Sequence, residues 1–276
     1  MLSEFYYGLI QRIFSQKINR INESVAVMTN NVALDYNRAG NNGSLDVIYQ
    51  LILDKLLNVA PNSGKVLDIS TGNSQILCRL AKNLPNLDFT GIDLSKDMLE
   101  IAKNNVTKNN LNNIKLKKHD MFKLDKLNKK YDLIIWTLAM HHCKNETQVI
   151  KVINDSLKLL NKDGILFIFD IERPKTKKIS LWFANRYNSK FGEYHYKDSL
   201  DSYNAAFSYE EFENMIKKSN WKNYIHKDPF NANFFQYAIS KTKNKFNRKN
   251  KPEFSNFKDR FGYYFLKLNF YLNNRE

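Results

Sequence analysis

Residues 65–85 read KVLDISTGNSQILCRLAKNLP. An apolar run ends at Asp68 and enters a turn of small residues, after which apolar residues recur at helical spacing. In an open parallel sheet, ligands bind beyond the carboxyl ends of the strands, where the strand order reverses. This stretch therefore predicts the first strand, the ligand-binding loop and the following helix of an α/β sheet.

Asp68 distinguishes this loop from one that binds a dinucleotide. Dinucleotide loops place glycine directly after the strand and rest the pyrophosphate on the helix N-terminus, where a neighbouring carboxylate would repel it. An acid at the strand tip instead suits a ligand with a positive charge or with hydroxyl groups.

Short apolar runs alternate with helix-period segments from residue 46 to residue 240. This rhythm predicts an α/β fold with a doubly wound, Rossmann-like, seven-stranded sheet. The sheet is expected to be mostly parallel, with a terminal antiparallel hairpin, and to carry N- and C-terminal helical extensions. The predicted strands are Lys65–Ile69, Phe89–Asp93, Ile114–Lys118, Leu133–Trp136, Ile165–Asp170, Lys222–Ile225 and Phe234–Ser240.

The two ends of the chain are expected to lie outside the main domain, residues 46–240. Apolar residues recur at helical spacing from Leu2 to Ile21 and from Phe254 to Leu272. The segment 1–45 is predicted to be a helical cap that covers the domain or acts as a lid over a ligand cleft. The basic, aromatic segment 241–276 could cover the domain, lie on an anionic membrane surface or contact RNA.

Composition is that of a globular protein, with 43% hydrophobic and 26% charged residues in 276. The net charge is +15, but residues 241–276 alone hold ten Lys or Arg against three acids, and abundant lysine and asparagine are typical of an AT-rich genome. The charge is therefore weak evidence for nucleic-acid binding. No long apolar run or signal peptide is recognised, and two cysteines, Cys78 and Cys143, make no disulfide framework. We expect a cytoplasmic protein.

The stretch Asp68-Ile69-Ser70-Thr71-Gly72-Asn73-Ser74 resembles the first motif of class I S-adenosylmethionine-dependent methyltransferases, acid-x-Gly-x-Gly-x-Gly. Of its three glycines this chain keeps only Gly72. Glycine is favoured there because it permits positive φ and close backbone approach, and Asn73 partly tolerates positive φ. The resemblance implies that Asp68, Ser70, Gly72 and Asn73 contact the cofactor, S-adenosylmethionine, whose product is S-adenosylhomocysteine. Ser70, in place of the first glycine, is expected to lower the affinity.

The following strand tips continue the resemblance. Asp93, 25 residues after Asp68, matches the family acid that binds both ribose hydroxyls, with Leu94 beside it. Asp120 resembles the acid that meets the adenine amino group, and Met121 would supply a backbone amide and an apolar wall. The fourth strand ends in Trp136 and Thr137, where relatives line the adenine pocket.

His141 and His142 follow the fourth strand, close to where the methyl group should project. Methyl transfer needs a general base only if the acceptor must lose a proton, and histidine is the usual base near neutral pH. We therefore predict that one of these histidines touches the substrate. Flanking segments supply further substrate candidates, namely Tyr36, Arg38, His195 and Tyr203. No metal site is predicted.

Two further stretches resemble the ubiquinone and menaquinone methyltransferase-like group. They are NVALDYNRAG at residues 31–40 and AMHH at residues 139–142. The leading hypothesis is thus methyl transfer to an oxygen, nitrogen or carbon atom of a small-molecule acceptor. Two alternatives remain: an RNA or protein methyltransferase that uses the basic C-terminal tail, and a non-catalytic subunit that binds the cofactor.

Overall fold

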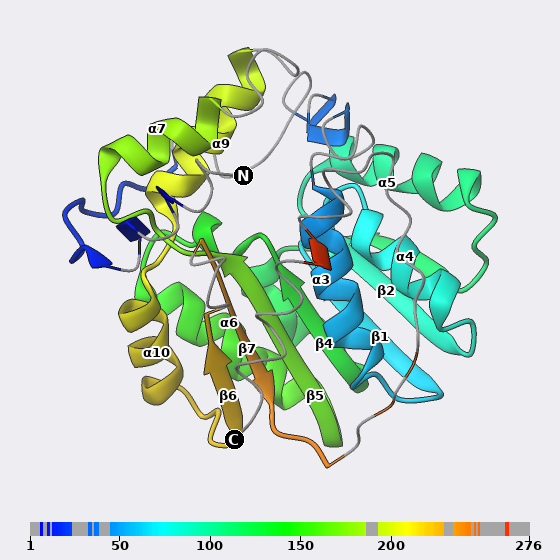
Figure 1. The fold of residues 1–276 in the computed structure, drawn as a ribbon. Coiled ribbons are helices and arrows are strands. Elements are labelled where there is room, and N and C mark those ends of the chain that lie inside the picture. Colours follow the sequence, from blue (N-terminus) through cyan, green and yellow to red (C-terminus); the bar gives the residue numbers. More distant parts are fainter. Residues whose placement is uncertain are drawn as a thin grey trace.

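A single seven-stranded sheet with the order β3-β2-β1-β4-β5-β7-β6 forms the centre of this computed structural model (Figure 1). The structure describes residues 6–7, 10–11, 13–23, 33–34, 36–38, 45–185, 193–228, 234–243, 246, 248 and 263–264. Its strands are β1 (Gly64–Ile69), β2 (Leu87–Asp93), β3 (Ile114–Lys118), β4 (Tyr131–Thr137), β5 (Leu160–Ile171), β6 (Tyr224–Lys227) and β7 (Phe235–Ser240).

Strands β1 to β5 pair in parallel, whereas β7 pairs antiparallel to both β5 and β6. Chain order reverses at β1, which lies between β2 and β4, so the switch point coincides with the loop that follows Asp68. In the register, Ile69 pairs with both Ile92 and Trp136, which brings the ends of three strands to one edge. This edge is where a ligand is expected.

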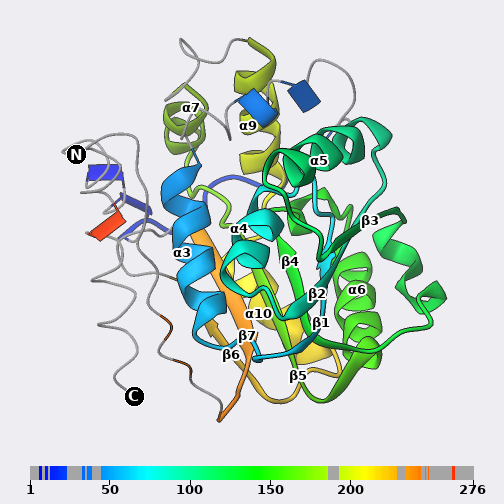
Figure 2. The ribbon, with the colours of Figure 1, turned by 90° about the vertical axis from the view of Figure 1, so that its right-hand side faces the viewer.

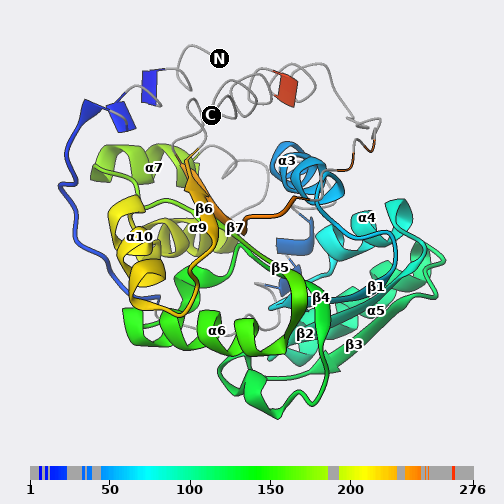
Figure 3. The ribbon, with the colours of Figure 1, turned by 90° about the horizontal axis from the view of Figure 1, so that it is seen from below.

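Helices cover both faces of the sheet. One apolar cluster packs α3 (Asp46–Leu57) and α4 (Gln75–Asn83) on one face, and another packs α6 (Glu146–Leu159) and α10 (Tyr209–Lys218) on the opposite face (Figure 3). Helix α5 (Lys96–Lys108) lies beside α4 (Figure 2). Two short 3-10 helices, η1 (Met121–Lys126) and η2 (Met140–His142), follow β3 and β4. The three-layer arrangement confirms the predicted fold class.

Two further helices, α7 (Lys177–Asn185) and α9 (Glu193–Ala205), lie above the carboxyl ends of the parallel strands in Figure 1. They contact each other, and α9 also contacts η2, the short helix with the two histidines. Both helices interrupt the strand-helix rhythm between β5 and β7, and α9 lines one side of the edge where the strand tips meet.

The N-terminal segment differs from the helix that was predicted through Ile21. Among the described residues, helix ends at Ile13, and residues 14–23 run as an irregular strap. Their amides bond other segments: Lys17 N donates to the Lys175 carbonyl at 3.0 Å, and Ile21 N donates to the Asn204 carbonyl at 3.0 Å. Tertiary hydrogen bonds have therefore replaced helical ones. Of the predicted C-terminal helix only Tyr263 and Tyr264 are described, both helical; the rest lies outside the described residues.

All seven predicted strands are present. The sixth begins at Tyr224, two residues later than expected; before it, Trp221 is buried in the core and its amide donates to Ser219 Oγ at 3.1 Å. Among the described helices, none combines the length and the apolar character that crossing a bilayer requires.

Candidate active site

A cavity of about 240 Å³ lies at the carboxyl ends of β1 to β4, with α9 on its far side. It brings together thirteen of the sixteen predicted site residues: Tyr36, Asp68, Ser70, Gly72, Asn73, Asp93, Leu94, Asp120, Met121, Thr137, His141, His142 and Tyr203. Trp136 and Arg38 are not among the lining residues, and the side chain of His195 lies outside the described part of the chain.

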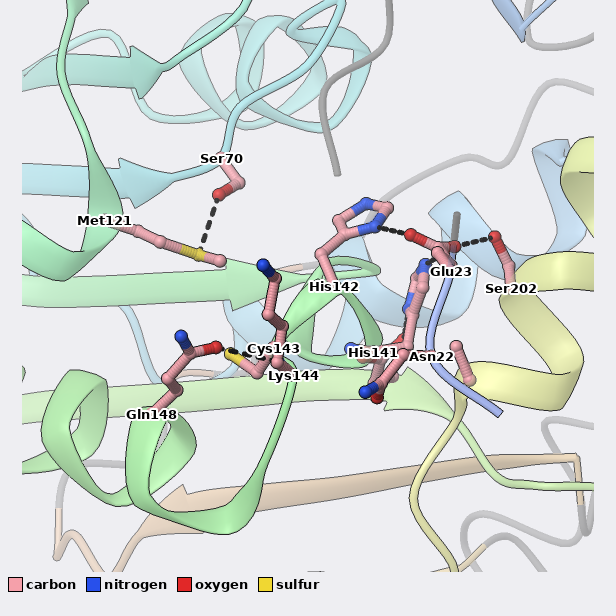
Figure 4. Close-up of polar contacts among 12 residues, drawn as sticks. Asn22, Glu23, Ser70, Met121, His141, His142, Cys143, Lys144, Gln148 and Ser202 are labelled. Carbon is pink, nitrogen blue, oxygen red and sulfur yellow. Dashed lines mark hydrogen bonds and ion pairs between the residues drawn. The ribbon is translucent and has the colours of Figure 1, made fainter. Parts of the chain in front are cut away.

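The loop after β1 keeps the backbone of a three-glycine turn without having three glycines. Ser70, Gly72 and Ser74 have φ values of 56°, 53° and 58°, all in the left-handed region. Residues with a Cβ adopt this region at a cost of roughly 1–2 kcal/mol. The Ser70 hydroxyl donates to Met121 Sδ at 3.4 Å (Figure 4). The turn thus has a left-handed backbone at three positions, of which only one is glycine.

Asp93, at the tip of β2, holds this loop in place. Its Oδ2 accepts from Gly72 N at 2.8 Å, and its Oδ1 accepts from Ser95 N at 2.9 Å. Burial raises the pKa of this carboxyl, while the two amides favour its ionised form. Each carboxylate oxygen retains a second lone pair, so Asp93 can still accept from a ligand in the cavity.

Asp68 is the most deeply buried acid of the lining, with 2% of its surface exposed. Its Oδ2 accepts from Thr71 Oγ1 at 2.6 Å, but Oδ1 is buried and has no hydrogen-bond partner among the described residues. Burial raises the pKa of Asp68 to about 7. A buried acceptor without a donor is costly, so this oxygen is suited to a cationic ligand group.

The tips of β3 and β4 form the opposite wall. Asp120 Oδ1 accepts from Phe122 N at 2.9 Å and so begins η1, while its Oδ2 lies 4.0 Å from Lys123 Nζ. Thr137 lines the cavity, whereas Trp136 is 1% exposed within the core cluster that packs on α6. Side chains alternate between the two faces of a strand, and this explains why only one of the two neighbours faces the ligand edge.

His141 is locked by an acid at the tip of β5. Its Nδ1 lies 2.8 Å from Asp170 Oδ1, and its backbone amide donates to Asp170 Oδ2 at 2.8 Å. Asp170 is fully buried and was not singled out from the sequence. Although burial disfavours the charged ring, the carboxylate of Asp170 raises the pKa of His141 to about 9.

His142 is paired with Glu23, which comes from the N-terminal strap (Figure 4). Nδ1 of His142 contacts Glu23 Oε2, while Glu23 Oε1 accepts from Ser202 Oγ at 2.7 Å. Burial opposes ionisation of Glu23, but the hydrogen bond to His142 and the charges of both histidines lower its pKa to about 2. Nothing in the sequence connects residue 23 with residue 142, because the pairing depends on the path of the strap.

Arg20 fixes the strap to the histidine loop. Its guanidinium donates to the carbonyls of Ala205, His141 and Cys143, and it lies over the Phe207 ring at 3.9 Å. This anchor stands three residues before Glu23. Arg20 therefore positions the carboxylate beside the two rings, a role that no sequence pattern predicted.

The cavity is acidic although the chain has a net charge of +15. Asp68, Asp93, Asp120 and Asp198 line it, and no Lys or Arg is found among its described lining residues. Burial raises the pKa of Asp198 to about 6. Such a lining favours ligands that carry positive charge.

A family model described as "Methyltransferase domain" matches residues 61–229. The chain belongs to this family. The match lies inside the predicted domain 46–240 and contains every strand tip of the cavity. The predicted class I S-adenosylmethionine-dependent methyltransferase domain is thereby confirmed. The division of the chain at residues 45 and 240 stays a prediction.

Solved structures share the fold of this methyltransferase domain. The plantazolicin methyltransferase BpumL in complex with SAH superposes with a TM-score of 0.57 at 18% identity, over 77% of this chain and 94% of that one.

Curated relatives match over part of their length. Release factor glutamine methyltransferase of Aliivibrio fischeri is 31% identical, but the chain covers only 30% of it. Demethylmenaquinone methyltransferase of Porphyromonas gingivalis is 26% identical over 55% of this chain and 62% of that protein. Carboxy-S-adenosyl-L-methionine synthase of Nautilia profundicola is 26% identical over 62% of this chain and 75% of that enzyme. The chain thus spans less than two thirds of the first two proteins.

Replacing Ser70 by glycine in the methyltransferase domain is expected to stabilise it by about 0.5–1 kcal/mol, because glycine takes a φ of 56° without steric cost. Urea denaturation of both proteins measures the difference. Ser63→Gly is the matched control: Ser63 is exposed and has no positive φ, so that variant should be neutral or less stable. Equal effects of the two substitutions would contradict the role of backbone strain at Ser70.

Cofactor binding is expected to weaken as the pH falls through 7. Asp68 has a pKa of about 7, so its carboxylate is present above that pH and protonated below it. A protonated carboxyl cannot pair with a cationic ligand group, and affinity should fall by up to about tenfold per pH unit below 7. Calorimetric titration with S-adenosylhomocysteine between pH 5.5 and 8.5 tests this. The Asp68→Asn variant should bind more weakly at high pH and lose this pH dependence.

Proposed function

We propose that this chain transfers the methyl group of S-adenosylmethionine to an oxygen, nitrogen or carbon atom of a small-molecule acceptor. The observation that carries the proposal is a single cavity. The acids at the ends of β1, β2 and β3 line one part of it, and the histidine pair lines another part, next to α9. The first part suits the ribose, adenine and cationic groups of the cofactor. The second part offers polar side chains to an acceptor.

In this arrangement Asp93 and Asp120 would hold the sugar and the base, and Asp68 would face the positively charged amino-acid end. These assignments follow the resemblance of the strand tips to those of the family. The methyl group would then point toward His141 and His142. Transfer is an in-line displacement at the methyl carbon with a neutral thioether as leaving group. The protein contributes mainly by orienting the reactants, an effect that can supply roughly 7–11 kcal/mol.

The lining supports a small neutral or cationic acceptor over a nucleic acid. A phosphate chain would meet four acids and, among the described lining residues, no Lys or Arg. Demethylmenaquinone methyltransferase, one of the relatives, is named for a small-molecule acceptor. If the basic tail recruited RNA instead, deleting residues 241–276 would abolish RNA binding and its dependence on salt.

The function is tested with cofactor that carries an isotopically labelled methyl group. The protein is incubated with this cofactor and extracts of small metabolites, and mass spectrometry searches for labelled products. We expect a labelled small molecule whose formation requires active protein and is strongly reduced in Asp93→Ala. Label found only on RNA or protein would refute the proposed acceptor class. Cofactor binding without any labelled product would favour the non-catalytic subunit.

A further inference from the structure

The group formed by Glu23, His141 and His142 has the composition and spacing of a metal site. One ligand atom from each residue lies within 4.8 Å of the other two. Two imidazoles and one glutamate are a set that holds Zn²⁺ in catalytic sites, where a fourth position is left for water or substrate. Among the described residues no other group meets the same criterion.

The distance between His141 and Glu23 is unsuited to a hydrogen bond. Nε2 of His141 lies 3.8 Å from Glu23 Oε1. Hydrogen bonds of this type end near about 3.2 Å. Two ligands held at about 2.1 Å from one tetrahedral ion are separated by about 3.4 Å. The observed separation is therefore close to that of two ligands that share an ion.

The residues that hydrogen-bond to His141 and Glu23 are of the kind that support metal ligands in proteins. Nδ1 of His141 is 2.8 Å from Asp170 Oδ1, so Asp170 fixes the ring and leaves Nε2 facing Glu23. A carboxylate on the remote nitrogen is the usual support of a metal-binding histidine. Glu23 is oriented in the same way, because its Oε1 accepts from Ser202 Oγ at 2.7 Å. These contacts orient His141 and Glu23, whereas His142 Nδ1 bonds Glu23 Oε2 directly, and an ion would replace that bond.

Charge also favours a cation at this place. The buried carboxylates of Glu23 and Asp170 lie beside the two imidazoles, and Asp198 of α9 lines the same cavity as the histidines. The guanidinium of Arg20, which anchors the strap, is bonded to backbone carbonyls of the histidine loop. A divalent ion between the rings and Glu23 would offset this negative charge.

We propose that Glu23, His141 and His142 bind one divalent transition-metal ion of the Zn²⁺ type at the acceptor end of the cavity. Nitrogen ligands favour Zn²⁺ over Mg²⁺, which prefers oxygen. His141 and His142 line the cavity, so the ion has a side that faces an incoming ligand. No metal was predicted from the sequence, because the two cysteines offer no cluster and no spacing pattern connects residue 23 with the histidine pair.

The metal site also narrows the chemical class of the methyl acceptor. This inference about the acceptor rests on the proposed function. An acceptor hydroxyl that binds the ion loses its proton to water, since a metal ion lowers the pKa of a bound O–H group. The oxygen then forms a bond to the methyl carbon as the carbon–sulfur bond breaks. Sulfur keeps the electron pair and leaves as S-adenosylhomocysteine. An acceptor with a metal-binding oxygen is thus expected.

Metal binding is measured on the full chain after dialysis against a chelator. Titration with Zn²⁺ in a calorimeter should show one ion per chain, and Glu23→Gln and His142→Ala should abolish this binding. Asp170→Asn disturbs the support of His141 but keeps all three ligand side chains, and it should weaken binding by about 10- to 100-fold. The control is His119→Ala, because His119 also lines the cavity but contacts the Lys123 carbonyl. That variant should bind as the wild type does.

Two results would overturn the metal site: no Zn²⁺ binding by the wild type, or equal binding by wild type, Glu23→Gln and His142→Ala. Binding of S-adenosylhomocysteine, measured on each variant, reports correct folding and stays intact if only the metal site is lost. Failure of the proposed function is recognised separately, as Zn²⁺ binding without any labelled methyl product. Access of an acceptor oxygen to the ion is tested separately: acetohydroxamate should shift the visible absorption of the Co²⁺-loaded protein. An unshifted spectrum would contradict an accessible ion.

Discussion

Replacing Asp93 by alanine is expected to weaken the binding of S-adenosylhomocysteine by about 1.5–3 kcal/mol, or roughly 10- to 150-fold. The carboxylate has two tasks. It accepts from the amides of Gly72 and Ser95, which keeps the loop after β1 in its left-handed conformation. It also faces the cavity, where the ribose hydroxyls are expected. Alanine removes both contributions together.

Calorimetric titration measures this loss, and Asp88→Ala is its matched control. Asp88 stands on the same strand as Asp93 but is exposed at the opposite end. That variant should bind S-adenosylhomocysteine like the wild type. Unaltered binding by Asp93→Ala would reject the assignment of the strand tips to the cofactor.

Replacing Asp170 by alanine is expected to lower the free energy of unfolding by about 3–5 kcal/mol. Asp170 accepts from His141 N, His141 Nδ1 and Ile171 N, and all of these contacts are buried. Alanine would leave three buried donors without this acceptor. The ring of His141 would also lose its orientation toward Glu23.

Urea denaturation followed by circular dichroism tests this prediction. Asp163→Ala is the control, since Asp163 is an exposed acid on the same strand, and a change within about 0.5 kcal/mol is expected there. Asp170→Asn keeps one carbonyl acceptor and should fall between alanine and wild type. An equal, small effect of the alanine substitutions at 163 and 170 would show that the Asp170 network contributes little.

Much of the strand-tip wall of the cavity was predictable because local patterns determine it. The first strand, its small-residue loop and the acids at residues 68, 93 and 120 stand in chain order at strand ends, and parallel strands bring such ends to one edge. Trp136 is the exception among these predictions. The pattern indicated the right strand end, but the alternation of faces placed its ring in the core.

Most of the positions that were missed depended on contacts that no local pattern encodes, but Asp170 did not. Asp170 carries the same signal as the other acids, a carboxylate at the end of a predicted strand, and could have been found by extending the rule to β5. Asp198 and Ser202 belong to α9, which interrupts the regular alternation. Arg20 and Glu23 lie in a strap whose apolar residues predicted a helix.

The amino-acid sequence by itself determined the α/β fold, the switch point and the row of acids that would hold the cofactor, because hydrophobic periodicity and strand ends are local properties. Only the tertiary structure decided that Glu23 meets His142 across 119 positions of the chain. That meeting depends on the hydrogen bonds of Arg20 to distant carbonyls. The energy of such contacts depends on which surfaces the folded domain presents to the strap. The spacing of residues along the strap does not reveal those surfaces.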